Sequence, residues 1–273
     1  MDYVNIQERG GDVIISGLDF FDFTTLDCGQ AFRWVKLDDE NFTGIAHGRR
    51  VNLRLQNGEL ILQNTTMAEY ENIWRDYFDF GRSYTTLREA LDNCDTMKKA
   101  LAFSTGLRLM RQCPWETLIS FILSQNSNIP RIKKMIEALC QNFGEKLACG
   151  GYAFPTPAVL AEADLAVIRS GYRAPYIQDA ARRTAAGEFD LHETATTDEL
   201  RAALLKVHGV GPKVADCVLL FGYGKLECFP LDVWIKRVVA KLYPNGLPTE
   251  LQEYAGIAQQ FLFHYARSNP AEF

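Results

Sequence analysis

The first hundred residues alternate apolar and polar positions with a period of two. The alternation is clearest at Val51, Leu53 and Leu55, which precede the pair Asn57-Gly58. This period predicts strands with one buried face, and Asn-Gly favours a type I′ hairpin turn. Further strands are predicted at residues 12–16, 32–37 and 42–47. We therefore expect a small antiparallel sheet with helical additions in this half.

From about residue 101 the apolar positions recur every three or four residues, which is typical of helices that bury one face. The predicted helices cover residues 115–123, 132–143, 198–207, 212–221 and 233–242. Pro114 suits the first turn of one helix, and Gly144 suits the end of the next. The fold class is therefore α+β, with the predicted domains at residues 1–103 and 104–273.

The charge of the chain is unevenly distributed. The 273 residues carry 29 basic and 34 acidic side chains, a net charge of −5, which argues against a protein that binds nucleic acid over its whole surface. However, segments 108–134, 169–183 and 201–241 together hold 16 basic and 5 acidic residues. The sequence thus predicts one basic face that can bind phosphate.

The seven cysteines are scattered and lack the paired spacings of zinc or redox sites. An odd number of unpatterned cysteines favours a reducing compartment. The N-terminus lacks the features of a signal peptide, and no apolar run approaches the length of a membrane span. We expect a soluble cytoplasmic protein with no metal, no cofactor and no membrane partner.

The most informative stretch is residues 204–222, LLKVHGVGPKVADCVLLFG. Two apolar-faced helices are separated here by a short reversal that contains Gly209, Val210 and Gly211. Glycine tolerates positive φ and close backbone approach, and the amides of such a hairpin and of the next helix N-terminus can bind a phosphate oxygen. A purely structural turn is the competing interpretation.

Lys213 and Asp232 are the candidate catalytic residues. The positive end of a helix and partial burial both disfavour an ammonium ion, and a neutral lysine amine is a nucleophile. Taken alone, Lys213 would be interpreted as a solvated lysine that contacts DNA phosphate. Asp232 lies where the next helix begins, so it could be an N-cap, and a capping carboxylate can also stabilise a cationic sugar or assist proton transfer.

At this point the chain resembles the helix-hairpin-helix (HhH-GPD) superfamily of DNA glycosylases, and within it the 8-oxoguanine DNA glycosylases. The resemblance rests on several separated motifs that occur in the same order. They are the hairpin GVGPK at 209–213, PLDV at 230–233, CGQAFRW at 28–34, NSNIPR at 126–131, GYR at 171–173, and AQ at 258–259 with Phe263. The implied fold is an N-terminal antiparallel TBP-like sheet followed by an all-α glycosylase domain, with the helix-hairpin-helix at about 199–221.

The resemblance also implies a base-excision reaction. Lys213 would attack the sugar C1′ of the damaged nucleotide and form a Schiff base, with Asp232 assisting, and β-elimination would then nick the strand. The implied enzyme is therefore a bifunctional N-glycosylase and apurinic or apyrimidinic (AP) lyase. Its partner would be double-stranded DNA that contains 8-oxoguanine, and its expected form is a monomer.

The base pocket implied by the resemblance consists of Gly29, Gln259, Phe263, Cys217 and Pro230. N7 of 8-oxoguanine carries a hydrogen where guanine has a lone pair, so the Gly29 carbonyl would accept from the lesion and repel the normal base. Gln259 would bond the Watson–Crick edge, while Phe263 and Cys217 would stack on the two faces. Without the flanking motif, Gly29 could simply serve a turn, and Phe263 could be a core residue.

A second set of residues would open the duplex. Asn126 would fill the vacated space, Tyr172 would wedge beside it, and Arg131 and Arg173 would donate to the orphaned cytosine. Cytosine presents acceptors at O2 and N3 that guanidinium groups can satisfy, whereas adenine places a donor on this edge. We therefore expect a preference for lesions opposite cytosine.

Three positions depart from the family pattern: Ser127, Pro130, and Trp234, which stands where a phosphate-binding histidine is common. The absence of a C-terminal cysteine quartet disfavours an iron–sulfur adenine glycosylase. The presence of Lys213 disfavours an alkylation-repair glycosylase. The remaining alternative is a non-catalytic helix-hairpin-helix DNA-binding protein.

Overall fold

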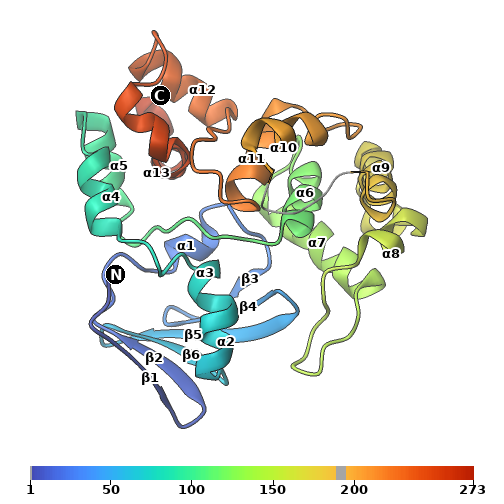
Figure 1. Ribbon diagram of the computed structural model, residues 1–273, viewed down its shortest axis with the longest axis horizontal. Coiled ribbons are helices and arrows are strands. Elements are labelled where there is room, and N and C mark those ends of the chain that lie inside the picture. Colours follow the sequence, from blue (N-terminus) through green and yellow to red (C-terminus); the bar gives the residue numbers. More distant parts are fainter. Residues whose placement is uncertain (1, 189–194) are drawn as a thin grey trace.

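The computed structural model describes residues 2–188 and 195–273. A sheet with a short helical cover forms one part of the molecule, and a larger set of helices forms the other (Figure 1). Helices α8 (Pro157–Glu162) and α9 (Ala174–Ala185) lie on the opposite side of the helical part from α4 (Tyr84–Leu91) and α5 (Asp95–Phe103). The expected α+β architecture is confirmed.

The sheet is antiparallel, with six strands in the order β1-β2-β6-β5-β4-β3. Its strands are β1 (Asn5–Arg9), β2 (Asp12–Ser16), β3 (Trp34–Lys36), β4 (Asn41–Ala46), β5 (Arg49–Gln56) and β6 (Glu59–Gln63). The turn between β5 and β6 has positive φ at both Asn57 (54°) and Gly58 (76°), as a type I′ turn requires. Leu55 therefore pairs with Leu60, and Leu53 with Leu62, so that Leu53, Leu60 and Leu62 are buried on one face with Leu55 partly buried beside them.

Two strands differ from the prediction. β1 was not predicted because it is an edge strand whose residues are mostly exposed, so it carries no apolar alternation. β3 is shorter than the predicted 32–37 because Phe32 leaves the sheet and packs edge-on against Phe121 of the helical part, with ring centroids 5.7 Å apart.

One face of the sheet is covered by a continuous helical stretch made of α2 (Met67–Glu69), a π-helical turn η1 (Tyr70–Trp74) and α3 (Arg75–Tyr77). Tyr70, Trp74 and Tyr77 pack into the same core as the buried strand residues Leu53 and Leu62. The short helix α1 (Thr24–Asp27) also contributes to this core through Leu26. The N-terminal part therefore has a hydrophobic core of its own.

The helical part continues with α6 (Pro114–Leu123), α7 (Ile129–Phe143), η2 (Leu165–Ile168), η3 (Gly171–Arg173), α10 (Thr197–Leu204), α11 (Pro212–Phe221), α12 (Val233–Leu242), η4 (Thr249–Tyr254), α13 (Ala255–Ser268) and η5 (Pro270–Glu272). Helix α6 is buried from Trp115 to Leu123 except at Glu116, which suits a central helix. Phe121 of α6 stacks on Phe221 of α11 with ring planes only 10° apart. Pro114 and Gly144 begin α6 and end α7 as predicted.

Helices α4 and α5 precede residue 104, yet Leu87, Leu91 and Leu101 belong to the core of the helical part. The division into domains at 103 and 104 thus stays a prediction. The helix predicted at 198–207 ends earlier, at Leu204. Its last residues tighten into turns in which the amide of Val207 donates to the Leu204 carbonyl, because the chain must reverse before α11.

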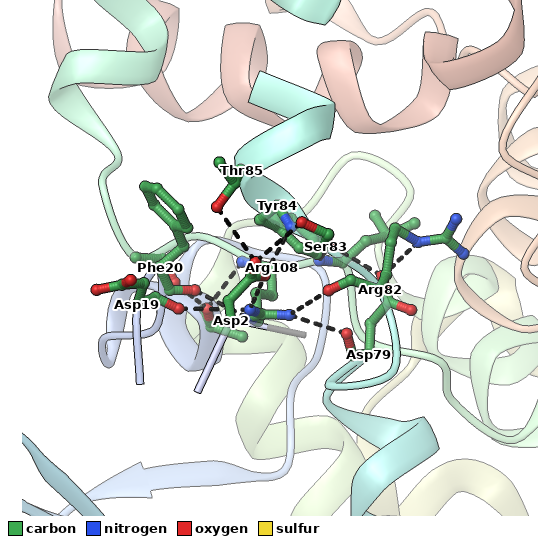
Figure 2. Close-up of polar contacts among 12 residues, drawn as sticks. Asp2, Asp19, Phe20, Asp79, Arg82, Ser83, Tyr84, Thr85 and Arg108 are labelled. Carbon is green, nitrogen blue, oxygen red and sulfur yellow. Dashed lines mark hydrogen bonds and ion pairs between the residues drawn. The ribbon is translucent and has the colours of Figure 1, made fainter. Parts of the chain in front are cut away.

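Arg108 joins segments that are far apart in the sequence (Figure 2). Its side chain is fully buried, and Nη2 donates to the Asp2 carboxylate at 2.7 Å. Nε donates to the Phe20 carbonyl at 2.8 Å, and Nη1 donates to the Asp79 carbonyl at 2.9 Å. The Tyr84 amide also donates to Asp2, at 2.6 Å. This buried hydrogen-bond network was not predicted from the sequence.

Candidate active site

A cavity of about 770 Å³ lies between the central helices and the loop that follows α1. All of the predicted catalytic and base-pocket residues line it, although they come from four separate segments of the chain. They are Gly29, Lys213, Cys217, Pro230, Asp232, Gln259 and Phe263. The cavity is thus the candidate active site.

Lys213 lies in the first turn of α11 and is partly buried. Its Nζ is 5.0 Å from the centroid of the Phe121 ring, so the aromatic face contributes to holding the amine at the cavity wall. Cys217 follows one helical turn later and is buried. Burial raises the pKa of the Cys217 thiol to about 11, although the charge and hydrogen bond of Lys213 act to lower it. The thiol is therefore protonated at neutral pH and forms a polarisable, uncharged wall.

Asp232 is the N-cap of α12, because its carboxylate accepts from the Ile235 amide at 2.8 Å. Burial raises the pKa of the Asp232 carboxyl above its ordinary value, while the Ile235 amide and the charge of Lys213 oppose the shift. Both sequence interpretations of Asp232 are compatible with this position, since the capping carboxylate also lines the cavity. A carboxyl with a raised pKa can exchange a proton more readily near neutral pH.

Gln259 on α13 is held in one orientation, since its Nε2 donates to the Pro230 carbonyl at 3.2 Å. Its Oε1 is buried and has no hydrogen-bond partner among the described residues. Phe263 lies one turn later on the same helix and lines the cavity as predicted. Gly29 has φ of +94°, and a Cβ there would lie 3.5 Å from Phe263 and 3.1 Å from Ile129, so a side chain at this position would enter the cavity.

The reversal before α11 differs in detail from the expectation. Gly209 has φ of +81° and lies so close to Tyr176 that a Cβ would be 2.3 Å from the ring. Gly211 has an extended backbone and open space beside it, so neither positive φ nor crowding within the protein requires glycine at this position. The Val210 amide donates to the Val207 carbonyl at 3.0 Å, so it closes the turn and is not free for phosphate.

Arg173 is the largest departure from the predicted roles. Its guanidinium is buried, and it donates to the carbonyl of Gln125 (Nε, 2.9 Å), to that of Asn126 (3.1 Å) and to that of Ser170 (3.0 Å). In this structure Arg173 therefore holds the loop between α6 and α7 and does not face an opposite base. Contact with cytosine would require these bonds to be exchanged.

The other predicted duplex-opening residues are accessible. Asn126 has a left-handed backbone (φ 47°), and its Nδ2 donates to the Tyr172 hydroxyl at 3.1 Å. Tyr172 is 48% exposed. Arg131 is exposed on the first turn of α7, whose N-cap Asn128 accepts from the Arg131 amide. Gln125 ties this loop to the hairpin by donating to the Gly209 carbonyl at 3.1 Å.

Sequence reasoning missed several cavity residues. Arg267 and Gln260 on α13 line the cavity, as does Phe121 on α6. At the rim, Lys133 pairs with Asp27 at 2.7 Å. Gln260 directly follows Gln259, and Arg267 lies eight positions after Gln259 on the same helix. A helical projection from Gln259 could therefore have placed Arg267 on the same face.

Among the described residues, no cluster of metal-ligating side chains is present. In the same part of the chain, every helix is too short or too polar to cross a bilayer.

A helix-hairpin-helix beside a cavity that is lined by a lysine and a capping carboxylate is the arrangement expected of a helix-hairpin-helix DNA glycosylase. Two family models match the chain: "8-oxoguanine DNA glycosylase, N-terminal domain" over residues 19–118, and "HhH-GPD superfamily base excision DNA repair protein" over residues 119–255. The chain belongs to the HhH-GPD superfamily of base excision DNA repair proteins and carries the N-terminal domain of its 8-oxoguanine DNA glycosylases.

Comparisons with individual proteins agree with this family membership. The chain is 33% identical to a probable N-glycosylase/DNA lyase of Methanothermobacter thermautotrophicus, over 75% of this chain and 76% of that protein. It resembles the solved structure of MBOgg1 bound to a low-affinity DNA ligand, with TM-score 0.91, 42% identity, and coverage of 99% of this chain and 100% of that one. It also resembles the 8-oxoguanine glycosylase/lyase of Clostridium acetobutylicum, solved with DNA that has cytosine opposite 8-oxoguanine (TM-score 0.92, 35% identity, 99% and 100% coverage).

Proposed function

We propose that this protein removes 8-oxoguanine from duplex DNA and then cleaves the strand. The observation that carries the proposal is the convergence of Lys213, Asp232 and the predicted base-pocket residues on one cavity. A purine that is rotated out of the helix could be held there while its sugar lies against the lysine. The family membership supports the same reaction.

In the proposed reaction, the Lys213 ammonium first gives up a proton. Its amine then attacks C1′ and the N-glycosidic bond breaks, so that the base leaves with the bonding electrons and takes up a proton. The ring C1′–O4′ bond then opens as nitrogen loses its proton, which gives a Schiff base. Loss of a C2′ proton expels the 3′ phosphate oxygen and nicks the strand. Asp232 stabilises the cationic sugar and moves the protons.

The opposite-base preference is part of the proposal. Arg131 is exposed, next to the loop that carries Asn126, and can donate to O2 and N3 of an orphaned cytosine. Monomeric form and a cytoplasmic, DNA-associated location stay predictions.

The proposed function is tested with duplexes that contain 8-oxoguanine or guanine opposite cytosine, in the presence of borohydride. Wild type should excise only the lesion and form a covalent adduct, and Lys213→Gln should form none. Lys99→Gln is the matched control, since Lys99 pairs with Glu272 on the surface. A wild-type protein that binds the lesion but neither excises it nor forms an adduct would favour the non-catalytic alternative.

A further inference from the structure

Arg267 lies in the last turn of α13 and lines the cavity beside two residues of the base pocket. Its Cζ is 5.6 Å from the centroid of the Phe263 ring. Its Nη1 is 3.3 Å from the position that a Cβ on Gly29 would occupy. The guanidinium therefore stands at the edge of the space in which Phe263 would stack on a base and Gly29 would read its N7.

Among the described residues, three residues that line the cavity have a buried polar side-chain atom without a hydrogen-bond partner, and one of these atoms is the Ser127 hydroxyl, which can donate or accept. In the described part of the chain, Arg267 Nη1 is buried without an acceptor, and Gln259 Oε1 is buried without a donor. Buried polar atoms are normally paired, and a ligand that supplies their partners gains affinity. Arg267 Nη1 and Gln259 Oε1 together specify a ligand that has N–H groups on one edge and a carbonyl oxygen on another.

An oxidised guanine has this pattern. Its N1–H and exocyclic amine can donate to Gln259, whereas O6 and the added O8 flank N7 as acceptors. Because Arg267 lies against Gly29, the carbonyl oxygens beside N7 would be close to its guanidinium. Adenine carries an amino group in place of O6. This amino group and the guanidinium are both hydrogen-bond donors, so they could not bond to each other.

We propose that Arg267 is a specificity-determining residue that donates to a carbonyl oxygen flanking N7 of the extruded oxidised purine. This inference rests on the proposed function, since it assigns the same cavity to the base. Arg267 is not required for strand cleavage at an abasic site, because an abasic sugar presents no base to it. The inference therefore separates base recognition from strand cleavage.

The test compares wild type, Arg267→Met and Arg267→Lys on two duplexes, one with 8-oxoguanine and one with an abasic site, each opposite cytosine. Methionine keeps an apolar stem beside Phe263 but has no donor. Arg267→Met should slow 8-oxoguanine excision by roughly 10- to 100-fold, the loss typical of one hydrogen bond from a charged donor, and should cleave the abasic duplex within about twofold of wild type. Arg267→Lys should retain part of the excision rate. Arg75→Met, which disrupts a surface ion pair with Glu71, is the control.

A third duplex distinguishes the two oxygens, since 8-oxoadenine keeps O8 but lacks O6. Contact with O8 predicts that Arg267→Met lowers affinity for both lesions, while contact with O6 predicts a loss for 8-oxoguanine alone. Unchanged excision of 8-oxoguanine by Arg267→Met would overturn the inference, and so would an equal loss on the abasic duplex. Failure of wild type itself to excise 8-oxoguanine would instead refute the proposed function.

Discussion

Replacing Arg108 by methionine tests how the two parts of the molecule are held together. The guanidinium is fully buried and makes three short hydrogen bonds, to Asp2, to the Phe20 carbonyl and to the Asp79 carbonyl. Methionine fills much of the same volume but supplies no donor. The Asp2 carboxylate would then be buried without its cation, and both carbonyls would lose a donor.

Breaking a buried ion pair by removing one partner costs about 3–5 kcal/mol. Each unpaired carbonyl adds about 1–3 kcal/mol, but contributions within one network are not additive. We therefore expect Arg108→Met to lower the free energy of unfolding by about 3–5 kcal/mol, a large share of the ~5–15 kcal/mol typical of a folded protein. The loss should be smaller when Asp2→Asn is already present, because no charge is then stranded.

Urea denaturation at pH 7 measures these differences, with Lys36→Met as the control, since its pair with Asp39 is exposed and should contribute nothing measurable. Burial acts to raise the pKa of Asp2, but the Tyr84 amide and Arg108 outweigh it and lower the pKa below the ordinary value of 3.8. The stability that Asp2 contributes is thus complete above that value and is lost as the pH falls below it. A loss under about 1 kcal/mol for Arg108→Met would refute this reasoning.

Three further changes test the site. Asp232→Asn should keep the helix cap and the free energy of unfolding but lower the excision rate by at least about 100-fold. Because burial raises the pKa of Asp232, the wild-type excision rate should fall as the pH drops through a value above 3.8. The pH–rate profile of the variant should lack this acidic decrease. Arg131→Ala should reduce the preference for cytosine by roughly tenfold, measured as excision opposite each of the four bases; an unchanged preference would exclude Arg131 as the cytosine contact. Gly209→Ala should destabilise the hairpin by about 1–3 kcal/mol, because the new Cβ would meet the Tyr176 ring. The variant should therefore bind duplex DNA more weakly in a salt titration. A variant that binds DNA as tightly as the wild type would show that the hairpin does not contact DNA.

Local signals predicted much of the fold. The β5–β6 hairpin, α11 and the capped start of α12 follow from period, turn residues and a capping aspartate, all of which act between near neighbours. The edge strand β1 and the π-helical turn were missed because neither carries a period that distinguishes it. Helices α4 and α5 join the core of the other part through tertiary packing, which no local pattern encodes.

The candidate site was predicted mainly through separated motifs, and the cavity does contain the predicted catalytic and base-pocket residues. The partners of charged side chains could not be predicted. Arg173 was expected to face DNA, yet its guanidinium is buried against carbonyls of the α6–α7 loop. Arg267 was overlooked because its importance depends on its proximity to Gly29, a residue that is distant in the sequence.

The most direct test of the central claim is the site of covalent attachment. Wild type is reduced with borohydride on a duplex that contains 8-oxoguanine opposite cytosine, digested, and analysed by mass spectrometry for the peptide that carries the sugar fragment. The added mass is expected on Lys213 alone. Attachment to another lysine or to the N-terminal amine, or excision of the lesion with no adduct at all, would contradict it.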